Sequence, residues 1–346
     1  MTGADAPLYT DGLPAPPGGF ARWVAASDGV RLRAGIWPEG SRGTVLMLPG
    51  RTEYVEKYLH VAVAMAAGGL ATVIVDWRGQ GLADRLLPDR AAGHVGAFRD
   101  YQRDVEAFTG LMRGIGLPEP WFLMAHSMGG CIGLRALLEG LPVRAAVFSG
   151  PMFGIRIEPW LRPAAWAVGL ASRAVGLGGG YAPTTGAESY VLTTPFADNA
   201  LTTDPEMYAL MQAQLRAHPE LALGGPTRHW LAEALIECRA LRALPSPDLP
   251  AYTAYGSEEQ IADTADMIDR MARWPGGRIE AYPGARHEVI METPERRARF
   301  FAAALALYAA AAAAPAPARG PASGSGSGPA PAGPAPAPDP DRALRS

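Results

Sequence analysis

The stretch Trp121-Phe122-Leu123-Met124-Ala125-His126-Ser127-Met128-Gly129-Gly130 decides the fold. Its first half is a continuous apolar run, which is typical of a buried strand, and helical periodicity follows directly after it. Ser127 therefore stands in a sharp turn between strand and helix, where its hydroxyl would project above the sheet. The amide of Met128 would lie at the N-terminus of the helix, where unpaired N–H groups can stabilise an oxyanion. The stretch predicts a nucleophilic serine.

Short apolar runs and helical stretches alternate on both sides of this turn, which is typical of a parallel sheet covered on both faces. The sequence therefore predicts an α/β fold with a mostly parallel central sheet. Two further runs, 22–26 and 30–37, are joined by the turn Ser27-Asp28-Gly29 and predict a hairpin. The other predicted strands are 44–48, 71–75, 121–125, 145–148, 251–255 and 278–282, and helices are predicted at 54–67, 98–112, 128–138, from 264 and from 294.

The alternation is interrupted once, which divides the chain into parts. Residues 151–226 are rich in aromatic residues and Met but contain no clear strand, and they are predicted to form a helical cap inserted into the sheet fold. The core is then formed by 21–150 and 227–312. Residues 1–20 are rich in Pro and Gly and predict an arm on the surface. Residues 313–346 are rich in Pro, Ala and Gly and predict a disordered tail.

Composition excludes several classes of protein. Hydrophobic residues make up 48% of the 346 residues, which excludes a wholly disordered chain. The net charge is −3 and the basic residues do not cluster, so no nucleic-acid partner is expected. Cys131 and Cys238 give neither a disulfide framework nor a metal site, and Cys131 is expected in the core. Lys57 is the single lysine, which we interpret as composition bias. The first residues lack a signal peptide and no apolar run is long enough to span a membrane, so a cytoplasmic location is expected.

Six motifs spread over the chain belong together. They are Pro49-Gly50-Arg51-Thr52-Glu53-Tyr54, Asp76-Trp77-Arg78-Gly79-Gln80-Gly81, His94-Val95-Gly96, His126-Ser127-Met128-Gly129-Gly130, Gly256-Ser257-Glu258-Glu259 and His287. With these motifs the chain resembles the α/β-hydrolase superfamily, and most of all its lysophospholipase L2 and monoacylglycerol lipase branch, with the serine aminopeptidase S33-type domain. Ala125 and Pro49 depart from the usual Gly and His of the family.

The resemblance implies a catalytic triad in the order Ser, acid, His. His287 follows the last predicted strand in a Gly-containing loop, where the general base is expected. The family places the acid at Glu259, where it usually has Asp. Asp263 is the rival and Glu258 the third candidate. A carboxylate at this place fixes the tautomer of the imidazole and stabilises the imidazolium.

The resemblance also implies that the amide of Arg51 joins that of Met128 in the oxyanion hole. Two interpretations of the Arg51 side chain stay open: it meets a phosphate or carboxylate of the substrate, or it is solvated or paired with Glu53. Asp76 and Arg78 are expected to brace the active-site loops through ion pairs.

The cap is expected to provide the substrate pocket. Met152, Phe153, Trp160 and Trp166 suit an acyl chain, although each could equally form the cap's own core. The apolar stretch 160–175 is the candidate for transient contact with a membrane surface.

The sequence therefore predicts a serine ester hydrolase for a small-molecule acyl ester, a lysophospholipid or a monoacylglycerol, without cofactor or metal. An amino- or iminopeptidase or amidase of the same fold is the alternative. A hypothesis from a different functional class is a protein of the same fold that binds a ligand without turning it over.

Overall fold

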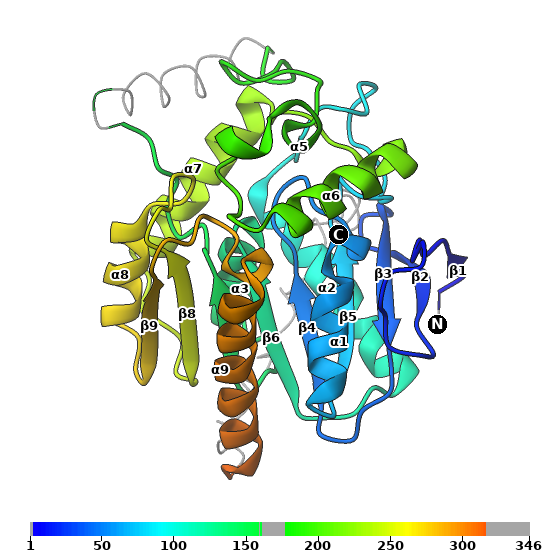
Figure 1. Ribbon diagram of the computed structural model, residues 1–346, viewed down its shortest axis with the longest axis vertical. Helices are drawn as coiled ribbons and strands as arrows, with labels where there is room; N and C mark the ends of the chain where they lie inside the picture. The colour runs from blue at the N-terminus through cyan, green and yellow to red at the C-terminus, as the bar shows by residue number, and fades with distance from the viewer. Residues whose placement is uncertain (1–2, 159, 161–176, 316–346) are drawn as a thin grey trace, which may run out of the picture. The chain divides into compact units, whose positions relative to one another are not determined.

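One sheet forms the centre of the structure, a computed structural model that describes residues 3–158, 160 and 177–315 (Figure 1). Within those residues its nine strands have the order β1-β2-β3-β5-β4-β6-β7-β8-β9. The strands β1, β2 and β3 pair antiparallel, as does β3 with β5, and all pairs from β5 to β9 are parallel. The predicted α/β fold with a mostly parallel sheet is therefore confirmed, and so is the hairpin of β2 and β3.

The bounds of strands β2 to β9 follow the apolar runs closely, and β1 is an additional short strand. They are β1 Asp5–Ala6, β2 Phe20–Ala25, β3 Arg31–Trp37, β4 Thr44–Leu48, β5 Ala71–Asp76, β6 Trp121–His126, β7 Ala146–Ser149, β8 Ala251–Gly256 and β9 Gly277–Tyr282. The described α-helices are α1 Leu59–Ala67, α2 Tyr101–Ile115, α3 Met128–Leu138, α5 Tyr190–Thr193, α6 Pro205–Ala217, α7 Arg228–Arg242, α8 Thr264–Ala272 and α9 Pro294–Ala313. No helix among the described residues is long and apolar enough to cross a membrane.

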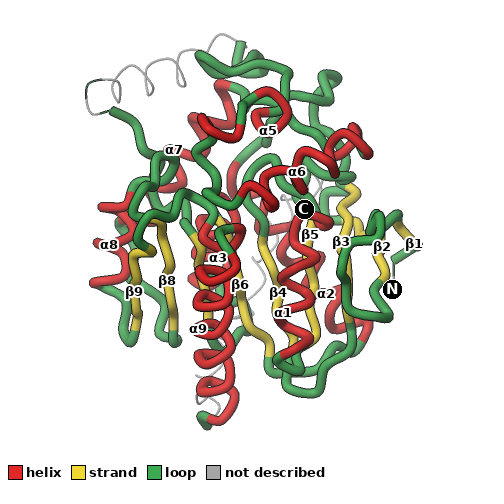
Figure 2. The backbone as a smooth tube through the Cα atoms, in the orientation of Figure 1, coloured by secondary structure: helices red, strands yellow, loops and turns green. Residues whose placement is uncertain are grey.

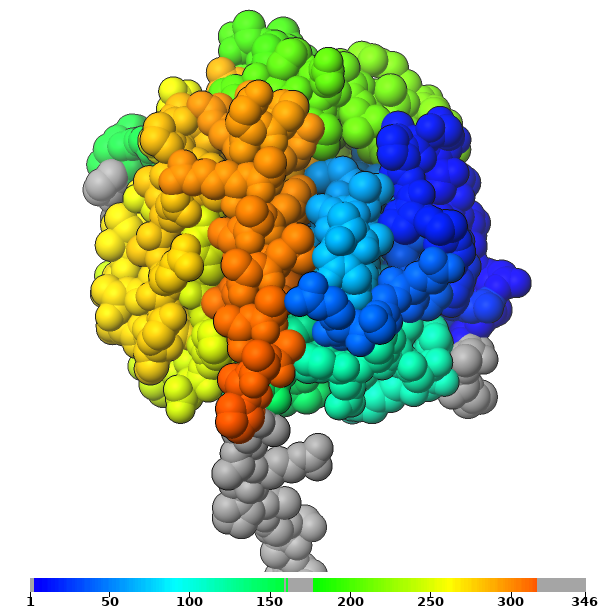
Figure 3. Space-filling view, turned by 60° about the horizontal axis from the view of Figure 1, so that its bottom comes forward, coloured from blue at the N-terminus to red at the C-terminus, as the bar shows by residue number. Residues whose placement is uncertain are grey.

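Helices cover both faces of the sheet because alternate residues of its strands point to opposite sides. On one face α1 and α9 pack on side chains such as Met47 and Met124. On the other, α2, α3, α7 and α8 pack on side chains such as Leu48 and Ala125. Figure 2 shows the helices on either side of the strands, and Figure 3 shows α9 (orange) beside α1 (light blue). Leu305 of α9 meets the chain at Gly68, just after α1.

The chain forms two units, Met1–Ala313 and Ala314–Ser346, and the fold lies in the first. Between β7 and β8 the chain leaves the sheet, and the described part of this insertion carries α5 and α6 before α7 returns to the core. The N-terminal arm, residues 1–20, was expected to lie on the surface, with no predicted strand. Within it, Asp5–Ala6 forms a short edge strand that pairs with β2. The predicted tail lies outside the described residues from 316 onward.

Candidate active site

The turn between β6 and α3 holds Ser127 in a strained conformation. Its backbone has φ 48° and ψ −117°, a region that side-chain-bearing residues rarely adopt. The helix can follow so closely because Gly129 has no side chain: a Cβ there would lie 2.1 Å from the carbonyl oxygen of Leu48. This geometry lifts the Ser127 side chain to the carboxyl end of the parallel strands, as the sequence predicts.

Two other loops at the same end of the sheet bring a histidine and a carboxylate to Ser127. His287, after β9, has its Nε2 2.9 Å from Ser127 Oγ. Its Nδ1 lies 2.6 Å from Glu259 Oε2, in the loop after β8. His287 and Glu259 are buried. The three side chains therefore form one continuous line of hydrogen bonds from carboxylate to hydroxyl.

The three carboxylates that the sequence offered as the acid of the triad, Glu259, Asp263 and Glu258, lie in different surroundings. The second oxygen of Glu259, Oε1, accepts from the amides of Ile261 at 2.7 Å and Ala262 at 3.1 Å. Asp263 instead caps the N-terminus of α8, where it accepts from the amide of Ala265 at 3.0 Å. Glu258 is exposed. Glu259 is thus the carboxylate whose orientation is fixed toward His287.

The charges of this pair shift both pKa values. Burial alone would lower the pKa of His287, but the carboxylate of Glu259 raises it above its usual value. Burial alone would raise the pKa of Glu259, but the charge of His287 and the hydrogen bonds to Glu259 lower it. The arrangement therefore stabilises an imidazolium beside a carboxylate, which is the charge state that follows proton transfer from Ser127.

The loop after β4 carries Arg51, which lines the same cavity as Ser127. Trp77 donates from its indole to the carbonyl of Pro49 at 2.9 Å, and Gln80 donates to that of Gly50 at 2.8 Å. The amide of Gly50 donates to the carboxylate of Glu53. The amide of Arg51 donates to no described residue, and Met128, as the first residue of α3, has no acceptor for its amide within the helix. Both amides are free to donate to a substrate oxygen.

The side chain of Arg51 does not pair with Glu53, which was one part of the second interpretation from the sequence. The Glu53 carboxylate is already engaged, by Tyr58 at 2.5 Å and Lys57 at 2.8 Å besides Gly50. Arg51 instead donates to the carbonyl of Gly224 at 3.0 Å.

The expected bracing by Asp76 and Arg78 is confirmed. Asp76 pairs with Arg33 at 2.7 Å and accepts from the amide of Val55 at 2.9 Å. Arg78 pairs with Asp104 at 2.7 Å and with Asp28 at 2.8 Å. These contacts connect β5 and the loop after it to β3, to α2, to the β2–β3 turn and to Val55, which follows the loop after β4.

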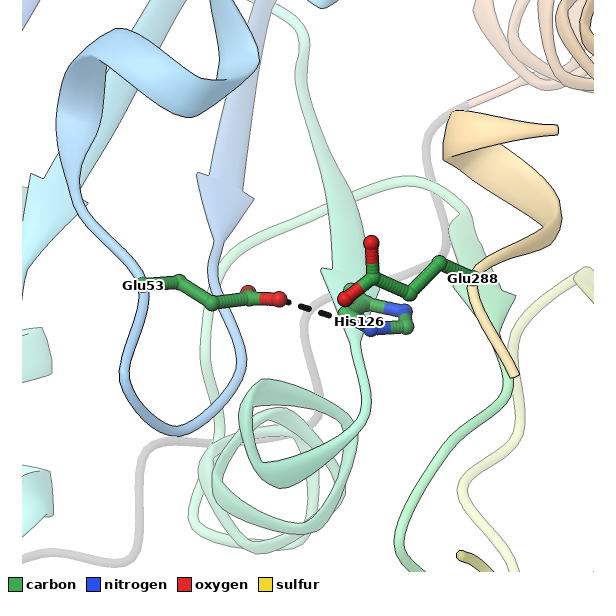
Figure 4. Close-up of side chains that lie close together, drawn as sticks. All are labelled: Glu53, His126 and Glu288. Carbon is green, nitrogen blue, oxygen red and sulfur yellow. Dashed lines mark ion pairs between the residues drawn. The ribbon is translucent and has the colours of Figure 1, made fainter. Parts of the chain in front are cut away.

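A buried charged cluster beside His287 was missed by the sequence reasoning. Lys57 lies between Glu53 and Glu288, with its Nζ 2.8 Å and 2.7 Å from their carboxylates (Figure 4 shows both carboxylates beside His126). His126 Nε2 is 3.6 Å from Glu53, and the ring of His126 lies 4.9 Å from that of His287. The single lysine, four residues after Glu53, was the signal that could have found it.

The cluster connects the loop of Arg51 to the loop of His287. Burial lowers the pKa of His126 to about 3, so its imidazole is neutral and donates from Nδ1 to the carbonyl of Ser149 at 2.8 Å.

Glu53, His126 and Glu288 are also residue types that bind metals. However, the ammonium of Lys57 already contacts both carboxylates, so a metal would have to displace an internal cation. The arrangement fits an internal ion-pair network better than a metal centre.

A cavity of about 690 Å³ opens above Ser127 and His287. Arg51 and Met128 also line it, and its walls are mainly apolar. The apolar lining comes from the loop after β7, the described cap and α7, and includes Met152, Ile155, Val191, Met211, Leu215 and Leu231. Such a cavity is of the size and character of a small-molecule site.

Of the four residues that were expected to bind substrate, three are described, and one of these lines the cavity. Met152 does so. Phe153 turns away and packs in the core against Phe148, with the ring centroids 5.4 Å apart. Trp160 is 75% exposed and is not part of the cavity wall. Trp166 lies outside the described residues.

Comparison with known proteins gives consistent results. Residues 39–294 match the family model described as serine aminopeptidase, S33. Lysophospholipase L2 of Escherichia coli is 33% identical over 267 residues, which cover 73% of this chain and 76% of the relative. The probable lysophospholipase L2 of Haemophilus influenzae is 27% identical over 74% of this chain and 81% of its own length. Among solved structures, a monoglyceride lipase from Saccharomyces cerevisiae matches with a TM-score of 0.66 and 19% identity, covering 89% of this chain and 99% of that one.

Proposed function

The chain belongs to the serine aminopeptidase S33 family of α/β-hydrolases, and from this premise we propose that it cleaves lysophospholipids or monoacylglycerols through an acyl-enzyme on Ser127. Ester hydrolysis is the activity that its lysophospholipase relatives support. The observation that carries the mechanism is the line of hydrogen bonds from Glu259 through His287 to Ser127, below an apolar cavity.

In the first half of the reaction, His287 Nε2 takes the proton of Ser127 as its oxygen attacks the ester carbonyl. Glu259 accepts from Nδ1–H, holds the tautomer in which Nε2 has a free lone pair, and stabilises the imidazolium. The amides of Arg51 and Met128 donate to the oxyanion of the tetrahedral intermediate. His287 then gives its proton to the leaving alcohol, and the acyl group stays on Ser127.

In the second half, His287 takes a proton from a water molecule, which attacks the acyl-enzyme. Collapse of the second intermediate returns the proton to Ser127 and releases the fatty acid. Besides the substrate and this water molecule, the steps use only groups of the chain: Ser127, His287, Glu259 and the two amides.

The apolar cavity supports an acyl substrate over the two alternatives. An iminopeptidase of this fold would be expected to bind the substrate amine with carboxylates of the cap, and of Glu158, Glu188 and Asp198 only Glu188 lines the cavity. A ligand-binding protein without turnover would have no use for a hydrogen-bonded serine, histidine and carboxylate beside two free amides.

A substrate panel tests the proposal. We expect hydrolysis of p-nitrophenyl butyrate, monoacylglycerol or lysophosphatidylcholine, a burst of product that reveals an accumulating acyl-enzyme, and no activity in Ser127→Ala. Preference for prolyl or other aminoacyl amides would replace the esterase by the peptidase alternative. Binding of these esters without turnover would favour the ligand-binding alternative.

We also propose that the cap contacts a membrane surface transiently. Trp160 is 75% exposed and Leu177 is 60% exposed, and exposed apolar side chains of this kind favour insertion at a lipid interface. Sedimentation with phosphatidylglycerol vesicles should detect binding that Trp160→Ala weakens, and unchanged binding of that variant would contradict the proposal. The cytoplasmic location stays a prediction, which cell fractionation tests.

A further inference from the structure

Arg51 carries a positive charge and lines the substrate cavity. Among the described residues its guanidinium forms no ion pair, and its hydrogen-bond partner is a carbonyl rather than a carboxylate. The other internal cation of the cavity, Lys57, is bound by two carboxylates. Burial lowers the pKa of Arg51 to about 10, so the guanidinium remains charged at neutral pH although it is partly desolvated.

The structure also fixes where this charge points. One N–H of the guanidinium donates to the carbonyl of Gly224, at 3.0 Å. Its central carbon lies 5.6 Å from the ring centroid of Trp230, which is within the range of a cation–π contact. A guanidinium has five N–H donors, and the Gly224 contact is the single hydrogen bond that the described residues provide to this side chain. The remaining donors are available to a ligand in the cavity.

We infer that Arg51 is a specificity-determining residue that binds the phosphodiester of a lysophospholipid headgroup while its own amide donates to the ester oxygen. This inference rests on the proposed function and narrows its substrate class. The amide and the guanidinium of one arginine are separated by a similar number of bonds as the ester carbon and the phosphorus of a glycerophospholipid. This similar spacing is the reason for assigning both contacts to one residue.

A monoacylglycerol, the other proposed substrate, has no anionic group to pair with the guanidinium of Arg51. A monoacylglycerol offers hydroxyl groups, which do not compensate a partly desolvated guanidinium, whereas the anionic oxygens of a phosphate match its planar donors. The apolar wall of the cavity then holds the acyl chain of either substrate, so Arg51 distinguishes the two by their headgroups.

The test compares two esters with the same decanoyl chain, lysophosphatidylcholine and monoacylglycerol, in the same detergent. We expect Arg51→Gln to lower the ratio of the two kcat/KM values by about 10–100-fold, the size expected for a lost charged hydrogen bond. The loss should appear mainly in KM for the lysophospholipid, and Arg51→Lys should restore part of the ratio. Arg216→Gln, which removes an exposed cation of α6 outside the cavity, is the matched control and should leave the ratio unchanged.

A second measurement is independent of lysophospholipid turnover. Glycerophosphocholine should inhibit hydrolysis of p-nitrophenyl butyrate competitively, and Arg51→Gln should weaken that inhibition about 10-fold or more. Inorganic phosphate distinguishes recognition of the whole headgroup from binding of any phosphate, and we expect it to inhibit more weakly. Thermal melting shows whether Arg51→Gln is folded. If it is not, Arg51→Lys is compared with the wild-type protein in its place.

The outcomes separate the inference from the proposed function. Equal losses on both esters in Arg51→Gln, with unchanged inhibition by glycerophosphocholine, would mean that the side chain only shapes its loop and would overturn the inference while leaving the esterase intact. A wild-type protein that cleaves neither ester would overturn the proposed function and this inference with it.

Discussion

Neutralising Glu259 should disable catalysis through the tautomer of His287. In Glu259→Gln the side-chain oxygen is expected to keep the acceptor position of Oε1, because the amides of Ile261 and Ala262 both donate there. The amide group of the new side chain then faces Nδ1 of His287, where Oε2 now lies at 2.6 Å. Since that amide is a donor, Nδ1 has to become an acceptor and the proton moves to Nε2. In this tautomer the ring donates to Ser127 instead of accepting its proton.

The magnitude follows from the two contributions that are lost. The wrong tautomer removes the general base, and the missing charge no longer stabilises the imidazolium in the transition state. Neutralising the acid of a serine triad costs up to about 10⁴-fold in kcat, and we expect about 10²–10⁴-fold here. At about 1.36 kcal/mol per factor of ten, this corresponds to about 2.7–5.4 kcal/mol of transition-state stabilisation.

The assay is the pH profile of kcat/KM on p-nitrophenyl butyrate. The base acts in its neutral form, and the pKa of His287 is raised above its usual value of 6.5 chiefly by Glu259. Wild-type activity should therefore fall as the pH drops through a value above 6.5, and in Glu259→Gln this limb should move to lower pH. Asp263→Asn, which retains a capping oxygen for α8, is the control and should change activity little. A loss of less than threefold in Glu259→Gln, or a larger loss in Asp263→Asn, would refute the reasoning.

Three further predictions concern the nucleophile, the buried charges and the cavity. A fluorophosphonate probe should label Ser127, and labelling that persists in Ser127→Ala, read by intact mass, would contradict its assignment. Lys57→Met should lower the free energy of unfolding by about 3–5 kcal/mol in urea titrations, because Glu53 and Glu288 stay buried without a counter-ion, whereas Lys57→Arg should lose less. A loss below 1 kcal/mol would show that the carboxylates do not depend on Lys57. On p-nitrophenyl esters kcat/KM should rise about twofold per methylene from acetate, if half of the burial energy of each CH₂ acts in the transition state; a maximum at acetate would exclude an acyl-binding cavity.

The sequence predicted the sheet well because buried parallel strands leave a simple signal. The apolar runs at 44–48 and 121–125 became β4 and β6, which pair in register from Thr44↔Trp121 to Leu48↔Ala125. The edge strand Asp5–Ala6 could not be predicted, since two polar or small residues carry no periodicity and pair only because β2 offers an open edge.

The candidate site was predicted where motif and topology agree, at Ser127 and His287. The choice between Glu259 and Asp263 depends on local geometry that residue type does not encode: one carboxylate accepts from the amides two and three residues ahead, while the other begins a helix. The aromatic residues of the cap were misleading for a similar reason. Phe153 and Trp160 are both apolar by type, but residue type does not indicate that Phe153 packs in the core while Trp160 faces solvent.

The cluster around Lys57 shows a limit of a different kind, because its members come from segments that are far apart in the chain. Glu53 and Lys57 are close in the sequence, but Glu288 is 231 residues after Lys57. Each residue by itself looks like an ordinary surface charge, and three charges become stable in the core only as a set. Glu53 accepts from the amide of Gly50 in the loop after β4, Glu288 follows His287 directly, and Lys57 binds both carboxylates. The one lysine of the chain thereby connects the loop after β4 to the loop of His287, so a change at this position should alter stability and, if these loops act in the proposed mechanism, catalysis as well.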